Sequence, residues 1–141
     1  MSQVVVESFG GTYTQRISGR GHEWLSDEPE ESGGNDRGPT PYQLLLASLG
    51  ACTSITAQMY ARRKGWPLEG VRVELEHQRV HARDCDGCES REGFVSKIEV
   101  RIAFSGELDE EQRQRLLEIA GKCPVKKTLQ GEVIIKPELV L

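Results

Sequence analysis

Three short segments with strand-like patterns open the chain and predict a small antiparallel meander. They are Val4 to Val6, Tyr13 to Ile17 and His22 to Ser26, and the glycine pair at positions 10 and 11 marks a turn between the first two. Residues 27–38 then run DEPEESGGNDRG, which is rich in acids and glycines and almost free of apolar side chains. We expect this stretch to be an exposed loop, long enough to carry function.

The most apolar part of the chain follows Thr40 and predicts a long helix. Thr40 suits the N-cap, Pro41 the first helical position and Gln43 the last position of a capping box. Apolar residues then cover most of the helix circumference from Leu44 to Tyr60, until a basic stretch and a glycine end the helix at Gly65. One sheet covers only one side of such a helix. We therefore expect another subunit to cover the other side.

Alternating apolar and polar positions return after this helix and predict a hairpin of two strands. Residues 71–78 and 98–104 alternate, and residues 84–93 form the loop between them. A second helix starts at its cap, Asp109, and runs to about Gly121. A short helical turn after Cys123 and a final strand over residues 131–136 complete the order. The chain is predicted to form a single α+β domain over residues 1–141, with antiparallel sheets and a long, central, buried helix.

Length and charge narrow the class of protein. The 141 residues suit one domain. The 18 basic and 22 acidic side chains give a net charge of −4, which argues against nucleic-acid binding through a basic face. The start of the chain has neither the basic residues nor the apolar stretch of a signal peptide. We expect a cytoplasmic protein with no membrane span and no cofactor.

Four cysteines are the main chemical clue, since a reducing cytoplasm favours redox or metal-binding thiols over structural disulfides. Cys52 lies within the apolar helix, where packing as a small apolar side chain explains it as well as chemistry does. Cys123 directly precedes Pro124 at the start of the short helix. Backbone N–H groups, the helix dipole and nearby lysines would favour its thiolate there. The local sequence therefore predicts Cys123 to be the more acidic thiol.

Cys85 and Cys88 form a C-x-x-C motif in the hairpin loop, with His77 and His81 upstream. The spacing suits a redox dithiol or an auxiliary disulfide, and it also suits zinc bound by all four residues or by the two cysteines with a partner's ligands. On an extended strand the two histidines would lie about 13 Å apart, which disfavours one shared metal. Incidental loop cysteines are the third interpretation. The flanking acids Asp84, Asp86, Glu89 and Glu92 would disfavour the thiolates and slow exchange.

Two motifs surround Cys52 and Cys123. The first runs from Gly38 to Cys52, GPTPYQLLLASLGAC, and the second is KCPV followed by Thr128 and Leu129. Together they resemble the OsmC/Ohr family of thiol-dependent hydroperoxide reductases. The resemblance spans essentially the whole chain, and it is closer to an OsmC-like branch that carries a cysteine-containing hairpin loop. It implies an intertwined homodimer with each active site at the subunit interface, an organic hydroperoxide as substrate and an external dithiol as reductant.

The resemblance also implies roles for particular residues. Cys52 would attack the peroxide and Cys123 would resolve the product, while an arginine held by a glutamate activates the attacking thiol. The family's glutamate stands ten residues before the first cysteine, where this chain has Tyr42. Arg37 in the polar loop is the preferred arginine, with Arg16 and Arg20 as alternatives.

We therefore predict reduction of organic hydroperoxides through Cys52 and Cys123, with Arg37 as the activating group. Two other interpretations stay open. The protein could instead exchange disulfides with other thiols. It could also be a non-catalytic module that binds small molecules or senses redox state, because the altered Arg–Glu pair weakens the case for efficient turnover.

Overall fold

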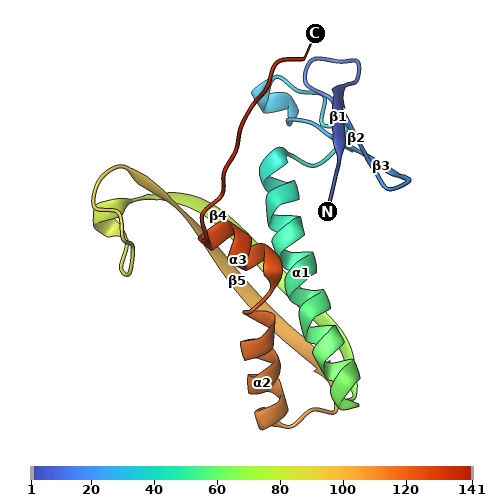
Figure 1. The fold of residues 1–141 in the computed structure, drawn as a ribbon, viewed down its shortest axis with the longest axis vertical. Helices are drawn as coiled ribbons and strands as arrows, with labels where there is room; N and C mark the ends of the chain where they lie inside the picture. The colour runs from blue at the N-terminus through green and yellow to red at the C-terminus, as the bar shows by residue number, and fades with distance from the viewer. Residues whose placement is uncertain (1, 141) are drawn as a thin grey trace. The chain divides into compact units, whose positions relative to one another are not determined.

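The computed structural model describes residues 2–140, and the chain divides into an N-terminal unit ending at Leu45 and a C-terminal unit starting at Leu46. Each unit contains its own antiparallel sheet, and the long helix α1 (Pro41–Lys64) begins in the first unit and continues through the second (Figure 1). The α+β class with antiparallel sheets and a long helix is therefore confirmed.

The N-terminal unit is the predicted meander. Strands β1 (Val5–Ser8), β2 (Gln15–Gly19) and β3 (His22–Ser26) pair antiparallel in that order, with Val6 opposite Ile17 and Ile17 opposite Trp24. The turn between β2 and β3 places Arg20 and Gly21 at positive φ, 52° and 83°, as a tight hairpin turn requires. Ile17 is the only apolar side chain of the three strands that is fully buried within the described residues.

The acidic loop after β3 is more ordered than its composition suggests. Asp27 is 2% exposed, although the sequence predicted an exposed loop from this residue onward. Its carboxylate accepts hydrogen bonds from the Thr14 hydroxyl at 2.7 Å and from the backbone N–H groups of Glu28, Asn35 and Arg37. A short 3₁₀ helix, Glu30–Ser32, lies between these anchor points. One buried carboxylate thus folds an otherwise exposed loop around itself.

Helix α1 begins as predicted, because Thr40 and Gln43 exchange the two hydrogen bonds of a capping box. The single chain buries only one face of it. Leu49, Thr53 and Ala57 are buried, while Ile55 and Met59 are 51% and 68% exposed. The expectation of a helix buried all round is therefore not met within one chain.

By length and composition alone, α1 would also pass as a membrane-crossing helix, with 33% of its most apolar window buried. The expectation of no membrane span stays a prediction. One such helix is weak evidence for a membrane, since the core helix of a soluble protein meets the same criteria.

The C-terminal unit is built on a long hairpin of β4 (Leu68–His81) and β5 (Phe94–Gly106), with the 3₁₀ turn η2 (Ala82–Asp84) in its loop. Helices α1 and α2 (Glu110–Ala120) both contribute to the core against this hairpin (Figure 1). Asp109 caps α2 with the predicted capping box. The buried core residues are Ala57, Tyr60, Ala61, Leu116 and Ala120, with Ile102 and Phe104 of β5 packed against them.

The last helix, α3 (Pro124–Gln130), starts as predicted, but the expected strand over residues 131–136 is wrong. Residues 131–140 are neither helical nor paired in a sheet. Apolar and polar residues alternate in part of this segment. A strand, however, needs a neighbouring strand that provides hydrogen-bond partners for its backbone N–H and C=O groups. Their large apolar side chains are exposed instead: Val133 51%, Ile134 75%, Ile135 80%, Leu139 89% and Val140 82%.

Candidate functional site

Cys123 lies at the N-cap of α3 and is fully buried. Its backbone is extended, and its sulfur accepts a hydrogen bond from the N–H of Lys126 at 3.4 Å. Pro124 occupies the first helical position, where its missing N–H is not needed. The sequence KCPVK therefore folds so that an unpaired N–H at the helix start points at the thiol.

Helix α1 brings two side chains to the same sulfur. The Thr53 hydroxyl oxygen lies 3.7 Å from Cys123 Sγ, and the Cys52 thiol is close enough to hydrogen-bond the Cys123 thiolate. Thr53 also donates to the carbonyl of Leu49 at 2.7 Å. Because a hydroxyl has one proton, Thr53 can give it either to that carbonyl or to the Cys123 thiolate. The two cysteines, 71 positions apart in the sequence, thus lie beside each other in the structure.

The surroundings favour the thiolate form of Cys123. Burial by itself raises the pKa of a thiol, but hydrogen bonds from the backbone of Lys126, from Thr53, from Cys52 and from the backbone of Val125 outweigh it. The pKa of Cys123 therefore lies below its ordinary value. This is the direction that the sequence argument gave for the Cys123 thiol.

Close packing holds α1 and the Cys123 segment in place. A side chain at Gly50 would come within 2.7 Å of Leu75 Cδ1 on β4, so glycine lets the helix approach the sheet directly beside Cys52. Helix α2 is also tightly packed, because Leu116 is 0% exposed and Ala120 is 1% exposed. Ala120 lies three residues before Cys123. The half-buried Cys52 and buried Cys123 are therefore positioned by the main core of the C-terminal unit.

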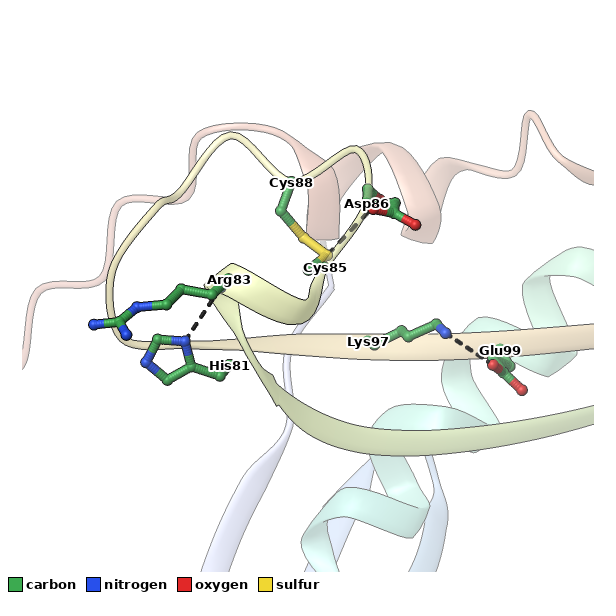
Figure 2. Close-up of a disulfide and its surroundings, with 7 residues drawn as sticks. All are labelled: His81, Arg83, Cys85, Asp86, Cys88, Lys97 and Glu99. Carbon is green, nitrogen blue, oxygen red and sulfur yellow. Dashed lines mark hydrogen bonds and ion pairs between the residues drawn. A yellow bond between two sulfur atoms is a disulfide. The ribbon is translucent and has the colours of Figure 1, made fainter.

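The other two cysteines form a disulfide in the hairpin loop. Cys85 and Cys88 are half-buried, and their Cα atoms lie 5.7 Å apart, within the usual range for a disulfide. Figure 2 shows this bond in the loop beyond the strand ends, with His81 and Arg83 at the base. The interpretation as an auxiliary disulfide thus matches the structure.

The proposed zinc ligands do not come together. His77 contacts the Ser96 hydroxyl at 3.0 Å, and His81 accepts a hydrogen bond from the Arg83 N–H through Nδ1. Cys85 and Cys88 are bonded to each other and hold no free thiolate. Across residues 2–140, no three or more His, Cys, Asp or Glu side chains are grouped as a metal ion would need.

The candidate arginines all lie in the N-terminal unit. Arg37 is exposed, and its guanidinium stacks over Phe9 with 5.6 Å to the ring centroid. Arg16 stacks over the same ring at 5.0 Å and forms an ion pair with Glu7. Arg20 lies exposed in the β2–β3 turn, and Tyr42 is 56% exposed in the first turn of α1. The activating role of Arg37 stays a prediction.

Thr53 and Lys126 were missed as site residues by the sequence analysis. Thr53 directly follows Cys52 and is a polar residue in an apolar helix, which was the available signal. Lys126 contributes its backbone N–H rather than its side-chain charge. The sequence pattern indicated backbone N–H groups at the helix start and the charge of nearby lysines, without assigning this particular N–H.

Comparisons with known proteins identify the family of the chain. A model of OsmC-like proteins matches residues 33–138, and the chain therefore belongs to the OsmC-like family. No curated protein matches the chain.

Solved structures extend the likeness to the fold. An OsmC like protein from Mycoplasma pneumoniae matches with a TM-score of 0.72 and 17% identity over 93% of this chain and 88% of that one. An organic hydroperoxide resistance protein OsmC from Legionella pneumophila matches at 0.64 and 19%, over 93% and 90%. The organic hydroperoxide resistance protein OhrB of Bacillus subtilis matches at 0.61 and 20%, over 93% and 91%. At these identities the likeness establishes the shared fold.

Proposed function

We propose that this protein reduces organic hydroperoxides with Cys52 and Cys123 as its reactive dithiol. Membership of the OsmC-like family and structural neighbours named for organic hydroperoxide resistance support a role in peroxide defence. The observation that carries the proposal is the convergence of Cys52, Thr53 and the α3 N-terminus on the sulfur of Cys123. The two thiols are close enough to hydrogen-bond each other, and such proximity favours an internal disulfide.

The proposed reaction consists of two displacements at sulfur and oxygen, followed by reduction of the resulting disulfide. The Cys52 thiolate attacks one oxygen of the peroxide, the O–O bond breaks, and the alkoxide leaves and takes a proton to become the alcohol. Cys52 is then a sulfenic acid. The Cys123 thiolate attacks its sulfur, water leaves, and the two cysteines form a disulfide. An external dithiol reduces this disulfide and is itself oxidised.

The environment of Cys123 fits the resolving role in this scheme. Its hydrogen bonds outweigh the effect of burial and lower its pKa, which favours the thiolate that attacks a neighbouring sulfenic acid. Cys52 needs a separate activating group, for which Arg37 is our candidate. A cation beside a thiol favours its negatively charged thiolate, which is the reactive form.

A homodimer would complete the site. Ile55 and Met59 expose the second face of α1, and the apolar side chains of residues 133–140 are also uncovered. Exposed apolar area of this kind is typical of an interface rather than of a monomer surface. Covering it with a second copy would also enclose Cys52 in apolar walls, which favours a hydroperoxide with a hydrocarbon tail. We expect the reaction to run in the cytoplasm with a dithiol reductant.

The decisive experiment follows both cysteines after one equivalent of cumene hydroperoxide. The reduced, full-length protein is quenched at intervals, and its disulfides are mapped by peptide mass spectrometry without reductant. We expect a Cys52–Cys123 disulfide to form within seconds to minutes in the wild type. In Cys123→Ser, a dimedone adduct should accumulate on Cys52, while Cys52→Ser should form neither product.

Other outcomes would contradict the proposal. If both thiols stay reduced, peroxide reduction is excluded. An adduct on Cys123 in the Cys52→Ser variant would reverse the assigned roles. Arg37→Met should slow the first step about tenfold or more, with Arg16→Met as the matched control that stacks on the same ring.

A further inference from the structure

The Cys85–Cys88 disulfide contributes little to holding the hairpin together. The strands already close the loop, because His81 pairs with Phe94 and the Ala82 N–H donates to the carbonyl of Gly93 at 2.9 Å. The stabilisation from a disulfide grows with the number of residues it encloses, and this one encloses only a C-x-x-C segment. Stability alone therefore does not account for the pair.

The loop around the disulfide has room to exist in both redox states. Gly87 lies inside the ring at φ +84°, and apart from its two chain neighbours no other residue has a heavy atom within 4 Å of where its Cβ would be. Asp86 and Gly87 are exposed, and both cysteines are only half-buried. An external thiol can therefore approach the sulfurs, and the ring can open without displacing packed side chains.

The base of the loop is independently ordered. The ring of His81 packs edge-on against Phe94 with centroids 5.5 Å apart, and its Nδ1 accepts the Arg83 N–H to cap the 3₁₀ turn (Figure 2). Arg79 stacks on the other partner of this contact, Phe94, at 5.0 Å. Opening the disulfide leaves all of these contacts intact, so the hairpin should hold the reduced pair in the same place.

The charges around the disulfide select the thiols that can react with it. Residues 82–93 carry four carboxylates against two guanidiniums, all exposed. The attacking species is always a thiolate, so this local excess repels a thiol that carries further negative charge most, a neutral one less and one that carries a positive charge least. The acidic side chains are Asp84, Asp86, Glu89 and Glu92, and the basic ones are Arg83 and Arg91.

We propose that Cys85 and Cys88 form a second thiol–disulfide exchange site, which accepts electrons from a neutral or cationic dithiol. A thiolate of that dithiol attacks one sulfur of the pair, the Cys85–Cys88 bond breaks, and the other sulfur leaves as a thiolate and is protonated. The second thiol of the dithiol then attacks the mixed disulfide. The protein gains two electrons and two protons, and the dithiol becomes a disulfide. The reverse steps pass the electrons to another disulfide.

The test uses the oxidised, full-length protein and no peroxide, so it is independent of the proposed peroxidase reaction. The native protein is treated with dithiothreitol, and differential alkylation with peptide mapping counts each cysteine pair separately. We expect Cys85 and Cys88 to be reduced without denaturant and to re-form their disulfide when oxidised dithiothreitol is added in excess. Survival of the disulfide until the protein unfolds would overturn the proposal and leave a structural cross-link.

Charge selectivity is measured with three monothiols of different charge. At equal thiolate concentration, cysteamine should reduce the pair faster than 2-mercaptoethanol, and glutathione should be slowest. Added salt should reduce the differences between these three rates, because it screens the charges. In Asp84→Asn/Asp86→Asn, the rate with glutathione should rise more than the rate with 2-mercaptoethanol, because both attack as thiolates and glutathione carries more negative charge. Equal rates for all three thiols in the wild type would overturn the assigned selectivity.

Thermal unfolding separates an exchange site from a structural one. The melting temperature of Cys85→Ser/Cys88→Ser should lie close to that of the wild type, because the sheet and the capped turn close the loop without the disulfide. A large fall in melting temperature would show that the pair serves stability and would overturn the proposal.

Discussion

The two cysteine pairs of this protein occupy opposite environments. Cys52 and Cys123 come from distant parts of the sequence and meet at the core of the C-terminal unit, where Cys123 is fully buried. Cys85 and Cys88 are three positions apart in an exposed hairpin loop. In the first pair the neighbouring hydrogen-bond donors set the reactivity, whereas in the second pair the exposed charges and the access of external thiols do.

The comparison shows why proximity of two cysteines in the sequence says little about their chemistry. A C-x-x-C spacing is enough for a disulfide to form, and local residues then decide which reductants reach it. The Cys123 thiolate depends instead on a hydroxyl 70 residues away and on the start of a helix. Its reactivity is therefore sensitive to the packing of the whole unit.

The largest expected effect separates the two pairs in peroxide turnover. Cys52→Ser should lower the rate of cumene hydroperoxide consumption with dithiothreitol by roughly a thousandfold or more, because it removes the attacking atom. Cys85→Ser/Cys88→Ser should leave that rate unchanged. A coupled assay of residual hydroperoxide measures both. An equal loss in the two variants would mean that the pairs act as one system.

The core that positions Cys123 is tested with a buried leucine and an exposed neighbour. Leu116→Ala should lower the free energy of unfolding by about 2–5 kcal/mol, since Leu116 is 0% exposed. Leu117 is 46% exposed, so Leu117→Ala should lower the free energy of unfolding by about 1 kcal/mol or less. Urea denaturation measures both values. Leu116→Ala should also change the alkylation rate of Cys123 but not that of reduced Cys85. An equal change at both cysteines would contradict the claim that only Cys123 depends on the packing of the core.

Asp27 tests the loop that carries Arg37. Burial raises the pKa of this carboxyl, but hydrogen bonds from Thr14 and the backbone of Glu28, Arg37 and Asn35 outweigh it and hold the pKa below its ordinary value. The carboxylate therefore contributes its full stability above the unfolded-state pKa, near about 4, and loses it as the pH falls through the folded-state pKa.

Asp27→Asn should accordingly be less stable than the wild type at pH 7, and the difference should shrink as urea denaturation is repeated toward pH 3. Asp36→Asn is the matched control in the same loop, since Asp36 is exposed. If Arg37 activates Cys52, Asp27→Asn should also slow peroxide consumption while exchange at Cys85–Cys88 continues at the same rate. A stability difference that grows in acid would contradict the assigned pKa shift.

The smallest effect concerns one hydroxyl. Thr53→Val removes a hydrogen bond to the Cys123 thiolate, so the pKa of Cys123 should rise and its alkylation rate at pH 7 should fall. Thr56→Val is the matched control, because Thr56 bonds only the carbonyl of Cys52 among its described partners. Iodoacetamide rates measured against pH would give both profiles. Equal shifts in the two variants would attribute the effect to the helix backbone.

Much of the fold followed from local patterns. The capping boxes at Thr40 and Asp109, the alternation in β4 and β5 and the proline after Cys123 are signals within a few residues of one another. The expected strand over residues 131–136 was wrong because alternation describes only one strand, whereas a sheet needs a second one beside it.

The sequence indicated the two cysteines of the candidate site but not the side chain that hydrogen-bonds to Cys123. The resemblance to a known family indicated Cys52 and Cys123, and the position of Cys123 before Pro124 indicated its acidity. Thr53 could not be assigned because nothing in the local sequence shows which face of a mostly apolar helix meets the α3 N-terminus. The burial of Asp27 was missed for the same reason, since its partner Thr14 lies across the meander.

The sequence by itself determined the elements, their order and the C-x-x-C loop, because helix caps, strand alternation and turn glycines act over a few residues. Only the tertiary structure decided that Thr53 and the Lys126 N–H meet at the sulfur of Cys123, and that this sulfur is buried. Those contacts join segments up to 70 residues apart. They depend on how close α1 packs to β4 at Gly50 and how α2 fills the core, which are properties of the packed chain rather than of any single segment.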